Sequence, residues 1–140
     1  MRWLSALLIS LFIFVPVAGW GVDWQFYGKG EEYDVFFDAD TIKHIDKNRV
    51  QVWIKYVADA EMIKRRYESA GKIPLNEDFF AYQKVLVEIN CAERKQRNLG
   101  ANNYSMTGKY LSSPPASTLG DWQIIIPDSL GDNLHKQVCK

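Results

Sequence analysis

Few side chains in the sequence could perform catalysis. The only two histidines, His44 and His135, are not accompanied by a nucleophile motif. Asp38 and Asp40 could be a pair of carboxylates for acid–base chemistry, but residues two apart where a strand enters a turn need not face a common pocket. There is no glycine-rich phosphate loop. These residue types predict a protein that is not an enzyme, with no catalytic, cofactor-binding or metal-binding residues.

Two basic clusters are better candidates for a function, namely the binding of an acidic partner. The first occupies residues 64–66, and the second comprises Arg94, Lys95 and Arg97. Glutamates close to both clusters partly offset their charge, so each is also compatible with an ordinary solvated surface. On a strand, alternation would send Arg94 to one face and Lys95 and Arg97 to the other. We take Arg94, Lys95 and Arg97 as candidate partner-binding residues.

The composition limits the class of protein. The 140 residues suffice for one domain, and the 14% of aromatic residues favours an ordered fold. Seventeen basic and 17 acidic side chains give a formal net charge of zero, which excludes a generally basic nucleic-acid-binding protein. We therefore expect no nucleic acid among the partners.

Residues 1–19 are typical of a cleaved signal peptide. A positive start at Arg2 precedes an uncharged run over residues 3–22, whose most apolar part is residues 4–17. As a helix, that part would reach about 21 Å, which is short of the roughly 30 Å hydrocarbon core. Pro16 would break the helix, and Ala18 and Gly19 suit signal peptidase. The whole run could also just span a membrane as an uncleaved anchor. We expect cleavage, export, a domain over residues 20–140 and no transmembrane span after cleavage.

Export changes the meaning of the two cysteines, Cys91 and Cys139. An even number of cysteines in an oxidising compartment indicates a disulfide, and two cysteines allow only one internal pairing. Two distant sulfurs and two histidines supply too few ligands for a metal site. The loop-entropy relation gives the bridge about 4 kcal/mol of stabilisation.

Hydrophobic patterns predict the elements that position these groups. Alternating apolar residues predict strands over 50–58 and 83–91, and shorter strands are expected at 34–38, at 122–126 and on both sides of a turn at 105–108. A short helix is expected after Asp59. Asp40 is expected to cap a helical turn at Thr41, and Ser129 a terminal helix whose apolar face carries Leu134 and Val138. The sum is an α+β fold, a single antiparallel sheet flanked by helices, with the terminal helix stapled to the sheet by one disulfide.

The order of several short motifs resembles the surface-adhesin protein E family of Gram-negative bacteria. These motifs are Asp40-Thr41-Ile42, Val50-x-Val52-Trp53, Val87-Glu88-Ile89-Asn90-Cys91, Tyr104-x-x-x-Gly108, Trp122-x-x-Ile125-x-Pro127-x-Ser129 and Val138-Cys139. The resemblance covers roughly residues 24–139. It implies an antiparallel sheet flanked by helices and a disulfide between the two matching cysteines. The family's namesake is an outer-membrane adhesin that binds host vitronectin, laminin and plasminogen.

The resemblance implies an exported, non-enzymatic binding module for a host extracellular-matrix or serum protein of the vitronectin or laminin kind. The partner would contact the sheet edge and Arg94, Lys95 and Arg97. The alternative is a periplasmic envelope protein without a host ligand. We expect the protein in the periplasm or at the outer-membrane surface of a Gram-negative bacterium, and the open sheet edges also allow a homo-oligomer.

Overall fold

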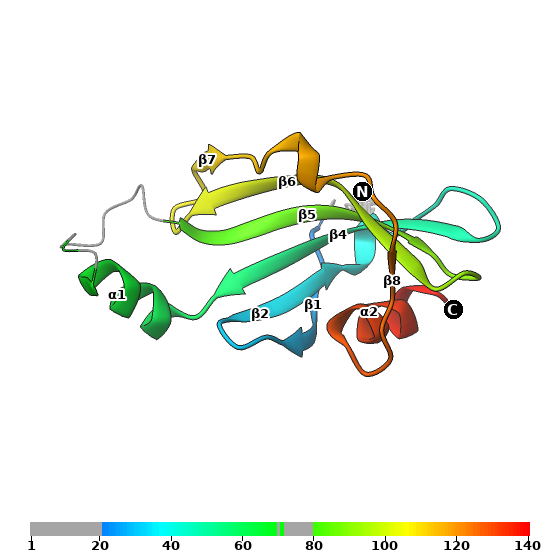
Figure 1. Cartoon of the computed structure of the whole chain (residues 1–140), viewed down its shortest axis with the longest axis horizontal. Coiled ribbons are helices and arrows are strands. Elements are labelled where there is room, and N and C mark those ends of the chain that lie inside the picture. Colours follow the sequence, from blue (N-terminus) through cyan, green and yellow to red (C-terminus); the bar gives the residue numbers. More distant parts are fainter. Residues whose placement is uncertain (1–20, 70, 72–79) are drawn as a thin grey trace, which may run out of the picture.

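The structure is a computed structural model that describes residues 21–69, 71 and 80–140 (Figure 1). The predicted signal peptide, residues 1–19, lies outside the described residues, as does most of the loop expected around Pro74. Among the described residues, no helix combines the length and the apolar character needed to cross a bilayer.

An antiparallel sheet forms most of the fold. Its strands are β1 (Trp24–Lys29), β2 (Tyr33–Asp38), β3 (Lys43–His44), β4 (Arg49–Ala58), β5 (Phe80–Asn90), β6 (Lys95–Ser105), β7 (Tyr110–Ser112) and β8 (Gln123–Ile124). The main path is β1-β2-β4-β5-β6-β7, while β3 pairs with β4 and β8 pairs with β6. The predicted antiparallel sheet is therefore confirmed.

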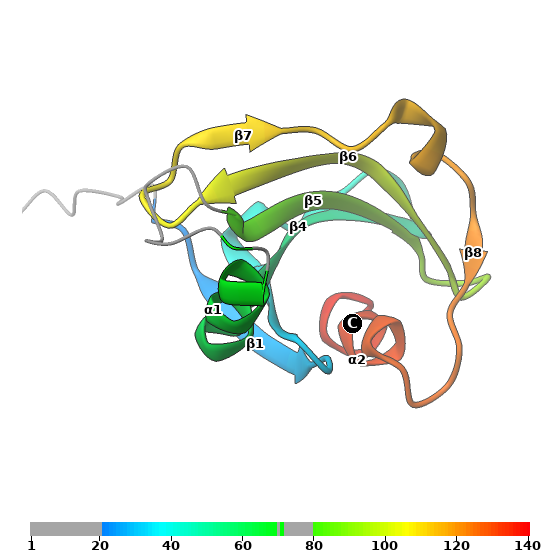
Figure 2. The ribbon, with the colours of Figure 1, turned by 60° about the vertical axis from the view of Figure 1, so that its left-hand side comes forward.

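In the described part of the chain, two α-helices and two short 3₁₀ turns accompany this sheet. The elements are α1 (Ala60–Ser69), α2 (Leu130–Val138) and the 3₁₀ turns η1 (Ala39–Thr41) and η2 (Ala116–Thr118). The sheet curves strongly, and α2 lies on its concave side (Figure 2). Helix α1 follows β4 at the end of the sheet that is far from α2 (Figure 1).

The core lies between the concave face of the sheet and α2. On β4, Val50, Val52 and Ile54 are buried, whereas the residues between them are half-buried. Val52 is opposite Val87 of β5, so the inward residues of the two strands meet. Removal of these apolar faces from water is the driving force that fixes which face of the sheet turns inward.

The terminal helix begins as its sequence predicts. The Ser129 side chain accepts a hydrogen bond from the Asp132 N–H at 3.2 Å, which satisfies one of the free amides of the first turn. Leu134 and Val138 are 1% and 4% exposed and belong to the main core cluster. The amphipathic pattern of the last ten residues thus identifies the face that packs against the sheet.

Two local predictions need correction. The turn after β2 begins at Ala39, two residues earlier than expected, so its cap is Asp38 and not Asp40. The Asp38 carboxylate accepts the N–H groups of Asp40 and Asp23 at 3.1 and 3.0 Å. The strand expected over residues 122–126 is limited to β8, because only Gln123 and Ile124 form ladder pairs with β6.

Candidate functional site

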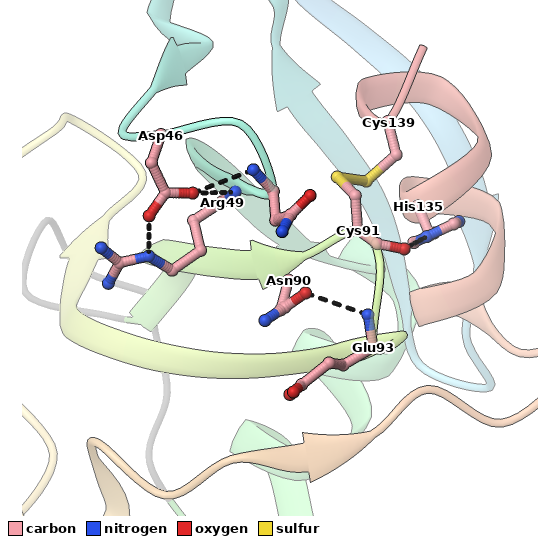
Figure 3. Close-up of a disulfide and its surroundings, with 8 residues drawn as sticks. Asp46, Arg49, Asn90, Cys91, Glu93, His135 and Cys139 are labelled. Atoms are coloured by element: carbon pink, nitrogen blue, oxygen red, sulfur yellow. Dashed lines mark hydrogen bonds and ion pairs between the residues drawn. A yellow bond between two sulfur atoms is a disulfide. The ribbon is translucent and has the colours of Figure 1, made fainter.

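The turn of the β5–β6 hairpin carries the first cysteine and is tied to the rest of the molecule (Figure 3). A disulfide joins Cys91, directly after β5, to Cys139, directly after α2, with 5.6 Å between the Cα atoms. The Cys91 carbonyl also lies 3.1 Å from Nε2 of His135, and the backbone N–H of Cys91 donates to the Asn48 carbonyl. His135 is half-buried against the hairpin. The hairpin end is therefore held by α2 and by the β3–β4 turn.

Arg94 attaches the same hairpin to α2. It has a left-handed backbone with φ of 52°, and its guanidinium lies 2.5 Å from a carboxylate oxygen of buried Asp132. Asp132 also accepts from Lys136 at 2.9 Å and from the Asp128 N–H. Hydrogen bonds from Lys136, Arg94 and Asp128 hold the Asp132 pKa well below its usual range. The charge of Arg94 is thus balanced within the fold.

Arg97 is on β6, opposite Glu88 of β5. Its Nε and Nη2 atoms lie 2.7 and 2.6 Å from one oxygen of Glu88, which is 2% exposed. Burial tends to raise the pKa of Glu88, but hydrogen bonds from Gln51 and Arg97 and the nearby positive charges outweigh it, so the pKa is lowered. The guanidinium also lies over the ring of Trp122, 4.5 Å from its centroid.

An exposed apolar patch adjoins Arg97. Trp122, Ile124 and Ile126 are 38%, 74% and 67% exposed, whereas Ile125 between them is buried. Lys95 is opposite Ile124, and its Nζ lies 3.6 Å from a carboxylate oxygen of Glu93, which is a long ion-pair contact. We call these outward residues the β8 patch, which comprises Lys95, Arg97, Trp122, Ile124 and Ile126. No strand in the described part of the chain pairs with the other edge of β8.

The three predicted basic residues therefore separate. Lys95 and Arg97 belong to the β8 patch, while Arg94 pairs with Asp132. The apolar residues of the patch were not predicted as functional residues, because a continuous apolar run does not reveal that only Ile125 is buried. The signal that could have identified them is the shortness of the run next to Pro127, which is typical of an edge strand.

A model of the family described as surface-adhesin protein E matches residues 24–140. The chain belongs to the surface-adhesin protein E family. The resemblance seen in the sequence motifs is thereby confirmed. The fold also resembles Haemophilus influenzae protein E in its crystal form II, with a TM-score of 0.53 and 13% identity over 81% of this chain and 91% of that one. For the selenomethionine form of the same protein, the TM-score is 0.53 and the identity is 14%, over 81% of this chain and 89% of that one. A comparison with curated proteins gave no significant match.

This member of the surface-adhesin protein E family also has a cavity of about 360 Å³ on the concave side, between the sheet, the β8 segment and α2. Uncharged residues line it, among them Tyr27, Tyr56 and Leu130. Burial is the main cause that raises the pKa of Tyr56 to about 12 and that of Tyr27 still further. Both phenols therefore stay protonated at neutral pH and can only donate or accept hydrogen bonds.

The candidate acid–base residues do not converge on this cavity or on each other. Asp38 is buried and accepts two backbone N–H groups, whereas Asp40 is exposed. His44 is exposed on β3. In the described ranges, no three histidine, cysteine, aspartate or glutamate side chains gather as a group that could hold a metal ion. The geometry thus directs attention to the β8 patch as a binding surface.

Proposed function

We propose that this member of the surface-adhesin protein E family is an exported, non-enzymatic binding module that attaches to a host extracellular-matrix or serum protein through the β8 patch. The supporting observation is that the segment around the edge strand β8 exposes Trp122, Ile124 and Ile126 beside the cations Lys95 and Arg97. Vitronectin and laminin are the partners that the family suggests.

The chemistry of the patch is that of a protein interface. Tryptophan and arginine are enriched among the residues that contribute most to binding, and they act best in a tightly packed centre. Arg97 is held in place by Glu88 and stacks on Trp122, so little side-chain entropy is lost when a partner covers the pair. The free edge of β8 adds backbone groups to which an extended partner segment can bond.

The three basic residues have two different roles in this proposal. Lys95 and Arg97 contact the partner, because they border the exposed apolar side chains. Arg94 is a positioning residue, since its ion pair with Asp132 holds the hairpin, and with it the start of β6, against α2. Its replacement would disturb the orientation of the patch without removing a contact to the partner.

Binding of the purified, oxidised protein to immobilised vitronectin and laminin at physiological salt tests the proposal. The variant I124S/I126S should bind about tenfold more weakly, because it removes the apolar centre of the patch. V22S/M106S is a matched control, since Val22 and Met106 are 62% and 64% exposed elsewhere on the molecule, and it should bind like the wild type. Equal affinities of the two variants, or no binding of the wild type to either protein, would contradict the proposal.

The location needs a separate measurement. Protease treatment of intact cells should degrade a protein displayed at the surface, whereas osmotic shock should release a periplasmic one. Protection from protease combined with release by osmotic shock would favour the alternative, a periplasmic envelope protein without a host ligand. Intact-mass measurement of the recovered protein would also locate the signal cleavage.

A further inference from the structure

The convex face of the sheet is turned away from α2 (Figure 2). On this face, near the end where α1 follows β4, aromatic rings and lysines lie close together. Lys55 of β4 is directly opposite Lys84 of β5, and Tyr82 of β5 is opposite Tyr104 of β6. These outward residues alternate with the buried Ile54 and Val85. We call Trp24, Lys55, Tyr82, Lys84 and Tyr104 the lysine–tyrosine cluster.

The two ammonium groups lie between aromatic rings. Nζ of Lys55 is 4.5 Å from the ring centroid of Tyr82 and 5.6 Å from that of Trp24. Nζ of Lys84 is 5.3 Å from the centroid of Tyr104 and 5.9 Å from that of Trp24. Tyr82 and Tyr104 stack on each other, with 5.1 Å between centroids and 13° between planes. The rings therefore hold both lysines in place and keep them close together.

Within the part of the chain that the structure describes, the charges of these two lysines have no ion-pair partner. Among the described residues, no carboxylate forms an ion pair with Lys55 or Lys84. Like charges directly opposite each other on neighbouring strands are destabilising. Partial burial, together with the charge of Lys84, lowers the pKa of Lys55. A bound anion would relieve the repulsion, whereas the cation–π contacts alone do not remove it.

The shape of the surface selects among anionic ligands. The backbone groups of β4, β5 and β6 are engaged in the sheet ladders, so an acidic peptide laid across this face would find few partners for its own backbone. A sugar chain needs only flat apolar faces and charged or hydroxyl side chains. The row of rings continues to Tyr110, which contacts Tyr104 edge to face at 6.3 Å and is 53% exposed. An extended chain can follow this row.

We propose that the lysine–tyrosine cluster binds an anionic polysaccharide, with its carboxylate or sulfate groups on Lys55 and Lys84 and its sugar rings against the aromatic side chains. The proposal does not depend on the β8 patch. That patch lies at the hairpin end of the sheet, and its cations have carboxylate partners, which Lys55 and Lys84 lack among the described residues.

Calorimetric titration of the full protein with dextran sulfate and polygalacturonate, at low and at physiological salt, tests the assignment. We expect binding of one or both polymers and none of neutral dextran. K55Q/K84Q should bind about tenfold more weakly, because two charge-assisted contacts are lost. The matched control K47Q/K140Q removes two exposed lysines at the other end of the sheet and should retain the wild-type affinity. Binding should also change the fluorescence of the wild type more than that of W24F.

Several outcomes would overturn the proposal. The first two are equal affinity of K55Q/K84Q and the wild type, and an equal loss of affinity in K47Q/K140Q. The others are absence of binding to both charged polymers, and tighter binding of poly-glutamate or of single-stranded oligothymidylate than of either polysaccharide. Thermal melting separates a lost site from a lost fold. Because Lys55 and Lys84 repel each other, K55Q/K84Q should melt no lower than the wild type.

Discussion

The disulfide between Cys91 and Cys139 should contribute about 4 kcal/mol to the free energy of unfolding. The perturbation is the double variant C91A/C139A, which opens a loop between residues 48 apart in sequence. For a loop of that length, the chain-entropy relation gives about 14 cal/mol/K, which is about 4 kcal/mol at room temperature. Both cysteines are only half-buried, so their truncation to alanine adds little to this loss.

Urea denaturation of the oxidised wild type, the reduced wild type and C91A/C139A measures the difference in their free energies of unfolding. The folded variant should keep α2 in place, because Leu134 and Val138 remain buried and Arg94 still pairs with Asp132. Near-ultraviolet circular dichroism verifies that the native packing is retained. A difference below about 1 kcal/mol between the oxidised protein and both other forms would refute the loop-entropy reasoning.

Three further predictions concern the contacts around α2 and the hairpin. Ser129→Ala removes the helix cap and should lower the free energy of unfolding by about 1 kcal/mol in the same urea assay; no change would contradict the capping role. The pKa of Asp132 is depressed in the folded state, so the unfolded chain binds more protons than the folded one in acid. The contribution of Asp132 to the free energy of unfolding should therefore be complete above about pH 4 and be lost as the pH falls below it. The melting temperature of Asp132→Asn should fall less steeply in acid than that of the wild type. Arg97→Ala leaves the charge of Glu88 buried without its main partner and should cost about 3 to 5 kcal/mol by urea denaturation, whereas the additional change Glu88→Leu should restore much of this loss.

The parts of the fold that follow local rules could be predicted from the sequence. Alternation of apolar side chains over β4 and β5 identifies the buried face, since a shift by one residue would expose every valine and isoleucine. The Ser129 cap and the apolar face of α2 are equally local. The predicted position of the turn after β2 was wrong by two residues, because Asp38 and Asp40 are both good caps and only the end of the ladder decides between them.

The charge pairs could not be predicted, because they depend on how distant elements meet. Arg94 and Asp132 are 38 residues apart and come together only when α2 docks on the concave face. Lys55 and Lys84 are each visible as outward residues of a strand, but their direct opposition needs the β4–β5 register. That register is fixed across a connection of more than 20 residues, over which sequence patterns carry no information about alignment.

The two proposed surfaces differ in the physics of binding, and this difference makes them separable. At the β8 patch the cations are already paired, so a partner gains mainly from the burial of Ile124, Ile126 and the Trp122 ring, and this gain is not weakened by salt. At the lysine–tyrosine cluster the gain comes from placing an anion beside Lys55 and Lys84. Because exposed charges are screened within about 10 Å at 0.1 M salt, rising ionic strength should release a polysaccharide well before it releases a protein bound at the β8 patch. One chain could therefore hold both ligands at once and lose them in a defined order.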